Sequence, residues 1–114
     1  MLCLNRIAVV VMARQRFLEW LHSVNPTSRE LTLRDINAEP TVHLLPECED
    51  DAEAAKLVRR FAKDIFIHEL DGWWRETLDW PKSMTRLVFE KWFEWRVHSI
   101  VLDLVEGRLT REEF

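Results

Sequence analysis

The sequence contains few of the residues that mark special folds. Its 114 residues include two glycines, four prolines, two cysteines and no tyrosine. So little glycine and proline excludes collagen-like and low-complexity chains, and Gly72 and Gly107 are too few for a glycine-rich phosphate loop. Cys3 and Cys48 form neither a CxxC pair nor a zinc array, so we interpret both as free thiols in a reducing cytosol.

Long apolar runs are also missing. The run near the N-terminus covers only residues 7–13, whereas a helix that spans a bilayer needs about 20 apolar residues. Arg14 and Arg16 follow it directly, and no small-residue cleavage site intervenes. We therefore expect no membrane partner and a cytoplasmic location.

The charge is acidic overall and unevenly distributed. There are 16 Lys and Arg residues against 20 Asp and Glu residues, a net charge of −4. A nucleic-acid binder usually carries a basic excess, because neutralised phosphates supply most of its affinity. The sequence therefore predicts no nucleic-acid partner. Five of the acids, without a base among them, lie in one segment, residues 47–53.

Hydrophobic residues make up 47% of the chain and charged residues 32%. The hydrophobic residues supply enough apolar surface for one folded core. We expect a single domain over residues 1–114, with a charged tail at 108–114 that frays. Residues 7–13 are continuously apolar and β-branched, which predicts a central strand. Residues 41–45, between two prolines, predict a second strand.

Helical periodicity covers much of the rest. Apolar spacing predicts a short helix over 17–24 and a single turn over 33–36. A helix over about 51–70 follows, with Asp50 as its N-cap and Gly72 as its end. From Met84 to about Val105 one apolar stripe predicts the longest helix, capped by Gly107.

This order, β-α-turn-β-α-α, predicts an α+β fold. A small sheet of two or three strands would pack against a layer of three main helices. Two strands leave open edges, so a third strand from a second copy, and hence a homodimer, stays an open alternative.

Tryptophan is concentrated near the C-terminus. Core packing is the favoured explanation, because indole rings bury large area. The alternative is a binding surface for a peptide, a sugar or a cationic head group. Trp92 is expected to be buried, whereas Trp95 and at least one of the Trp73-Trp74 pair are candidates for a partner-binding rim. Five of the six tryptophans lie within 23 residues: Trp73, Trp74, Trp80, Trp92 and Trp95.

The acidic segment is a second candidate for partner binding. Its members Glu47, Glu49 and Asp51 could dock a partner through charge. The alternative is that the acids only complement the N-terminus of the following helix, since the helix dipole favours negative charge there.

Two pairs of residues could in principle hold a metal ion. Asp64 with His68, and Glu94 with His98, each have i, i+4 spacing, which places both side chains on one face of a helix. The spacing differs from the i, i+3 motif of di-iron bundles, so the metal site is the weaker hypothesis. It would support a small metal-dependent or hydrolytic enzyme.

The order of aromatic and proline positions resembles that of small, uncharacterised bacterial single-domain proteins. The resemblance spans most of the chain, and it implies a bacterial, cytoplasmic protein without implying an activity or a site. It rests on Ile7–Val11, Pro40 to Pro46-Glu47, Phe66-x-x-Glu69-Leu70-x-x-Trp73, Trp80-Pro81, Phe89-x-x-Trp92-Phe93 and Asp103.

No nucleophile and base occur in a recognisable catalytic motif. The sequence therefore favours a non-catalytic cytoplasmic protein-binding or adaptor module, without a cofactor, over the metal-dependent or hydrolytic enzyme.

Overall fold

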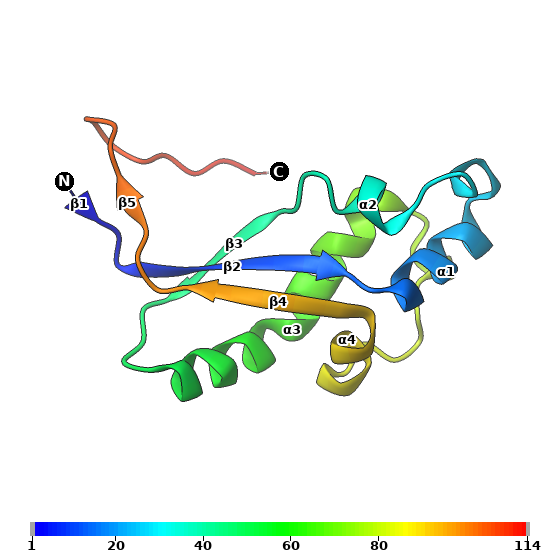
Figure 1. Cartoon of the computed structure of the whole chain (residues 1–114), viewed down its shortest axis with the longest axis horizontal. Coiled ribbons are helices and arrows are strands. Elements are labelled where there is room, and N and C mark those ends of the chain that lie inside the picture. Colours follow the sequence, from blue (N-terminus) through cyan, green and yellow to red (C-terminus); the bar gives the residue numbers. More distant parts are fainter. Residues whose placement is uncertain (1, 114) are drawn as a thin grey trace.

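The computed structural model describes residues 2–113 and has an α+β architecture (Figure 1). Three antiparallel strands form the main sheet, in the order β3-β2-β4. The helices α3 and α4 lie on one side of this sheet, and α1 packs at its end. The fold class predicted from the sequence is confirmed. The elements are β1 (Leu2–Cys3), β2 (Arg6–Ala13), α1 (Gln15–Val24), α2 (Leu33–Ile36), β3 (Val42–Pro46), α3 (Asp51–Trp73), α4 (Arg86–Trp92), β4 (Phe93–His98) and β5 (Leu102–Asp103), with 3₁₀ turns at Pro26–Ser28 and Thr77–Asp79.

The apolar run near the N-terminus is the central strand β2, as predicted. Its alternate residues Ile7, Val9 and Val11 are at most 3% exposed and face the helices. They pack in one core with α3, which supplies Val58, Ile65 and Phe66 among others. Strand β3 pairs with one edge of β2, and Leu45 lies opposite Ile7.

The prediction of one long helix from Met84 to Val105 is wrong. Helix α4 begins at Arg86, where the Thr85 hydroxyl accepts a hydrogen bond from the Val88 backbone N–H. It ends at Trp92, and the chain continues as β4, which pairs antiparallel with β2. This pairing places the alternating residues Phe93, Trp95 and Val97 on the core face, because successive strand residues point to opposite sides. The third strand therefore comes from the same chain.

Gly107, expected to cap that helix, lies in an irregular segment well beyond β4, with a φ of 106°. Strands β1 and β5 pair as a small two-stranded extension at one end of the molecule (Figure 1). Beyond β5 the tail turns back along the β3 side of the molecule.

Candidate functional site

The tryptophan cluster belongs mainly to the interior. Trp92 is 8% exposed, and its ring packs against those of Phe17 and Phe66 at centroid distances of 6.3 and 5.3 Å. Trp20, on α1, packs against Trp92 at 5.8 Å. These contacts join α1, α3 and α4, so Trp92 occupies the buried position predicted for it.

The loop after α3 satisfies several of the indole N–H groups. Trp74 Nε1–H donates to the Asp79 carboxylate at 3.0 Å, and Trp20 Nε1–H donates to the Asp79 carbonyl at 2.9 Å. Trp80 Nε1–H donates to the Trp74 carbonyl at 2.7 Å. Trp73, by contrast, is 37% exposed. These bonds give Trp74 and Trp80 a structural role in holding the loop.

Trp95 lies on β4 rather than on a helix. Its ring stacks on Phe89 at 6.0 Å with an interplanar angle of 25°, and it is half-buried against the core. The sequence analysis expected Trp95 at a partner-binding rim on a helix. The structure instead turns its side chain toward the core.

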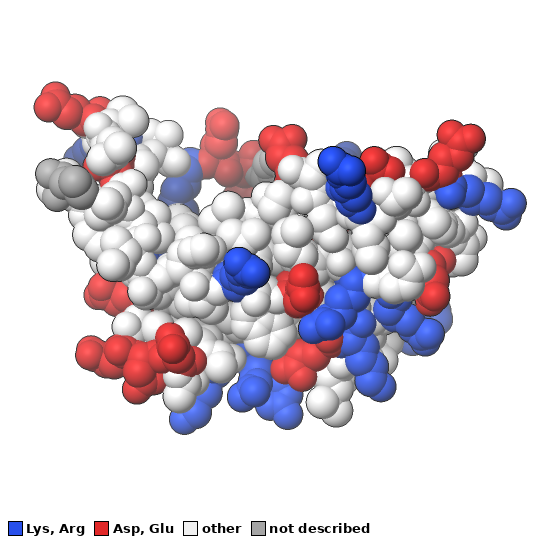
Figure 2. Space-filling view, in the orientation of Figure 1, with Lys and Arg blue, Asp and Glu red and all other residues white. Residues whose placement is uncertain are grey.

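The acidic segment lies where α3 begins, and Figure 2 shows acidic side chains gathered at this end of the molecule. The Asp50 carboxylate accepts a hydrogen bond from the Glu53 N–H at 2.8 Å, which confirms the predicted N-cap. Glu47, Glu49 and Asp51 are exposed. Since α3 rises 1.5 Å per residue, Asp51 and Trp73 are about 33 Å apart. The acids and the Trp73-Trp74 pair thus do not form one binding site.

The two candidate metal pairs lie on opposite faces of the sheet. Asp64 and His68 are on α3, which covers the inner face. Glu94 and His98 are on β4, opposite Met12 and Ala8, and they project from the outer face. Within residues 2–113, no three His, Cys, Asp or Glu side chains gather in a way that could hold a metal ion. The constellation proposed from the sequence is therefore not assembled.

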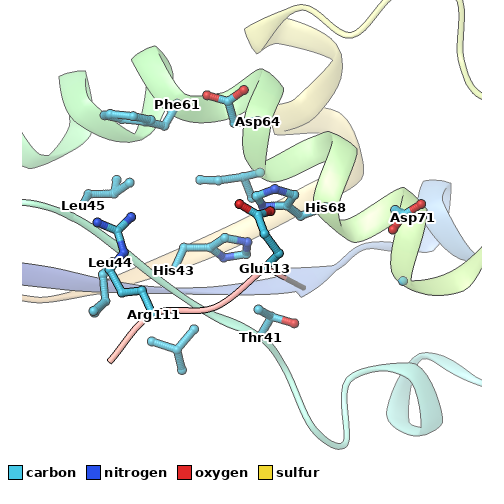
Figure 3. A pocket seen from close by; sticks show the side chains of 13 residues that line it. Thr41, His43, Leu44, Leu45, Phe61, Asp64, His68, Asp71, Arg111 and Glu113 are labelled. Atoms are coloured by element: carbon cyan, nitrogen blue, oxygen red, sulfur yellow. The ribbon is translucent and has the colours of Figure 1, made fainter. Parts of the chain in front are cut away.

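His68 instead meets His43, which the sequence analysis did not single out. A groove of about 770 Å³ runs between β3 and the C-terminal half of α3 (Figure 3). The two imidazole rings stack in it, with centroids 5.9 Å apart and an angle of 4° between their planes. Leu45, Phe61 and Ile65 supply apolar walls. The available sequence signal was the alternation of His43 with Leu45 on the inner face of the predicted strand.

The environment of His43 disfavours its charged form. Neither ring nitrogen has a hydrogen-bond partner. Burial lowers the pKa of His43, and the neighbouring His68 lowers it further. The neutral imidazole ring of His43 thus forms part of the groove wall, and its two ring nitrogens make no hydrogen bond.

The C-terminal tail lies along this groove. Arg111 and Glu113 contribute to its lining, and Figure 3 shows the Glu113 side chain directed toward the two histidine rings. Asp64 and Asp71 lie on either side of His68 along α3, so the groove carries carboxylates as well as imidazoles.

The outer face of the sheet is a second candidate surface, because no helix of residues 2–113 covers it (Figure 1). Val42 and Leu44 on β3 are 55% and 49% exposed, and Val10 and Met12 on β2 are half-buried. Figure 2, in which this face is turned toward the viewer, shows few charged atoms over its centre.

Both cysteines are free. Within residues 2–113, none of the helices combines the length and the apolar character that crossing a bilayer requires. Comparison of the chain with protein-family models, with curated proteins and with solved structures found no match. The functional proposals therefore rest on the fold, on the groove between β3 and α3 and on the outer face of the sheet.

Proposed function

We propose that the chain is a non-catalytic protein-binding or adaptor module of the bacterial cytoplasm, and that it binds an extended segment of a partner protein in the groove between β3 and α3. The observation that carries this proposal is the groove itself, an edge strand facing a helix across an apolar floor. The free thiols and the resemblance described above support the cytoplasmic and bacterial setting.

The edge strand supplies the first part of the recognition. Within the described residues, β3 pairs only with β2, so its other edge offers unpaired backbone N–H and C=O groups. Extended peptides bind such edges as an added strand, with backbone hydrogen bonds giving affinity and pockets for alternate side chains giving specificity. The groove lies along this edge, with lining residues from Thr41 to Leu45.

The side chains of the groove define the ligand chemistry. The chain's own tail is an extended segment that already lies there, with Glu113 directed toward His43 and His68. An imidazole N–H can donate a hydrogen bond to a carboxylate. Asp64 and Asp71 can pair with a basic side chain further along the segment. The proposed ligand is therefore an extended peptide that carries an acidic residue and a basic residue.

Peptide display against the full-length chain tests this proposal. Peptides selected from an unstructured library are labelled, and their affinity is measured by fluorescence anisotropy. The double variant Asp64→Lys/Asp71→Lys should weaken binding at least tenfold, about 1.4 kcal/mol. The matched control Glu47→Lys/Glu49→Lys makes the same change of charge in the acidic segment and should leave the affinity within about twofold.

If the acidic-segment variant weakened binding and the groove variant did not, the docking site would lie at the acidic segment. Loss of binding only in Trp73→Ala, which lies outside the groove lining, would move it to the tryptophan rim. Failure to select any peptide, with the chain folded by circular dichroism, contradicts the groove proposal.

A further inference from the structure

The outer face of the sheet divides into an apolar part and a charged part. Residues that lie opposite each other in neighbouring strands project to the same side. Val42 and Leu44 therefore share the outer face with Val10 and Ala8, with which they pair. The third strand contributes only polar side chains to this face: Glu94, Arg96 and His98, all exposed.

The molecule has more surface than a compact monomer of its mass. The accessible surface is 8826 Å² for 13.7 kDa, about a third more than the roughly 6,600 Å² expected of a globular monomer. The radius of gyration is 15.5 Å, against about 13 Å for a compact chain of this length. The β1–β5 extension and the tail stand away from the main sheet (Figure 1), and their exposed side chains, such as Leu104 and Leu109, contribute to this excess.

We infer that the chain forms a homodimer in which the outer sheet face of one copy packs on the same face of a second copy. A standard stable interface buries about 800 Å² on each partner, and the exposed Val42 and Leu44 would form part of its apolar area. Two sheets packed face to face, about 10 Å apart, enclose a core from their facing side chains. The sheet would then lie between two layers, as sheets with apolar side chains on both faces do.

The charges on β4 support a second copy as the occupant. In a two-fold dimer the same patch meets itself, so the patch must complement itself. When the two β4 strands run antiparallel across the interface, Glu94 of one copy lies opposite Arg96 of the other, and the reverse pair forms by symmetry. The opposite charges therefore match along the β4 edge, while Val10 packs on the central strand and Val42 and Leu44 pack along the β3 edge.

The proposed dimer does not depend on the groove. Val42 and Leu44 belong both to the groove lining and to the dimer face, but the residues that test the two proposals are separate. Glu94 and Arg96 lie on β4, outside the groove lining, and Asp64 and Asp71 lie on α3. Each proposal can therefore fail without the other.

Sedimentation equilibrium of the full-length chain tests the inference. Wild type is expected to dimerise in a concentration-dependent way. Arg96→Glu and Glu94→Arg should each weaken the dimer at least fivefold, because each places like charges opposite one another. The exchanged double variant, Glu94→Arg/Arg96→Glu, should restore the dimerisation constant to within about twofold of wild type. These side chains are exposed, so each variant should retain its melting temperature as a monomer.

Two further variants serve as controls. Lys91→Glu makes the same change of charge as Arg96→Glu but lies on α4, so it should leave the dimer intact. The groove variant Asp64→Lys/Asp71→Lys should also leave it intact. A wild-type chain that stays monomeric at about 1 mM, far above the dissociation constants of specific dimers, overturns the inference. So does a dimer that the two single reversals do not weaken.

Discussion

Glu69 shows how one buried side chain can work against stability. It follows Ile65 by four residues and Phe66 by three, which places it on the core-facing side of α3. Its Oε1 atom is buried without a hydrogen-bond partner, and burial raises the pKa of Glu69 to about 7. Above about pH 7, the folded protein therefore holds a poorly solvated carboxylate.

The sign of the resulting pH dependence follows from the raised pKa. The folded state keeps the proton of Glu69 up to about pH 7, whereas the unfolded chain loses it near 4.5. Stability is thus lost as the pH rises between these values. Glu69→Gln should remove this loss and raise the free energy of unfolding at pH 8 by up to about 3 kcal/mol, with little difference from wild type at pH 4.

Urea unfolding at both pH values measures this effect. The exposed Glu76→Gln serves as the control and should change neither value. His43, whose lowered pKa destabilises the fold as the pH falls below about 6.5, is present in all three proteins and cancels in the comparison. Equal stability of wild type and Glu69→Gln at pH 8 would mean that water or a rearrangement solvates the carboxylate.

At the scale of single elements, the cap of α3 can be tested separately from partner binding. The Asp50 carboxylate accepts the N–H of Glu53, so Asp50→Ala should lower the free energy of unfolding by about 1 kcal/mol. Asp51→Ala removes the neighbouring acid without removing the cap and should cost less. Denaturation followed by circular dichroism gives both values. Equal losses would show that the charge near the helix dipole matters more than the hydrogen bond.

The helices and strands with one unambiguous period could be predicted from the sequence, and the region after Thr85 could not. Phe89, Phe93 and Val97 repeat every four residues, which is typical of a helix, but Phe93, Trp95 and Val97 also alternate as in a strand. Pairing with β2 decides between the two periods, because β4 completes the sheet. Such long-range pairing overrides local periodicity.

At the scale of the whole molecule, the same limit applies to the candidate site. The core position of Trp92 and the cap at Asp50 depend on local spacing, and both could be predicted. The histidine pair depends on the register that places His43 opposite Val9 and on the packing of α3 against β3. The alternation of His43 with Leu45 places His43 on the inner face of the strand, but it does not predict that His68 meets it there.

The aromatic core offers the sharpest test of the architecture as a whole. Trp92 contacts the rings of Phe17, Trp20 and Phe66 and so connects α1, α3 and α4. Trp92→Ala should leave a cavity and cost about 3–5 kcal/mol, a large part of the 5–15 kcal/mol that stabilises a typical domain.

Trp73→Ala is the matched control, because it removes a ring of the same size that is 37% exposed. This variant should lower the free energy of unfolding by less than about 1 kcal/mol. Loss of the exposed Trp73 ring should reduce the fraction of fluorescence that iodide quenches. Loss of the buried Trp92 ring should not reduce that fraction in a folded sample. Both variants are unfolded in urea at several protein concentrations, because a dimer makes the apparent stability depend on concentration. If Trp92→Ala were as stable as Trp73→Ala at every concentration, the aromatic cluster would not be the centre that joins the helices to the sheet.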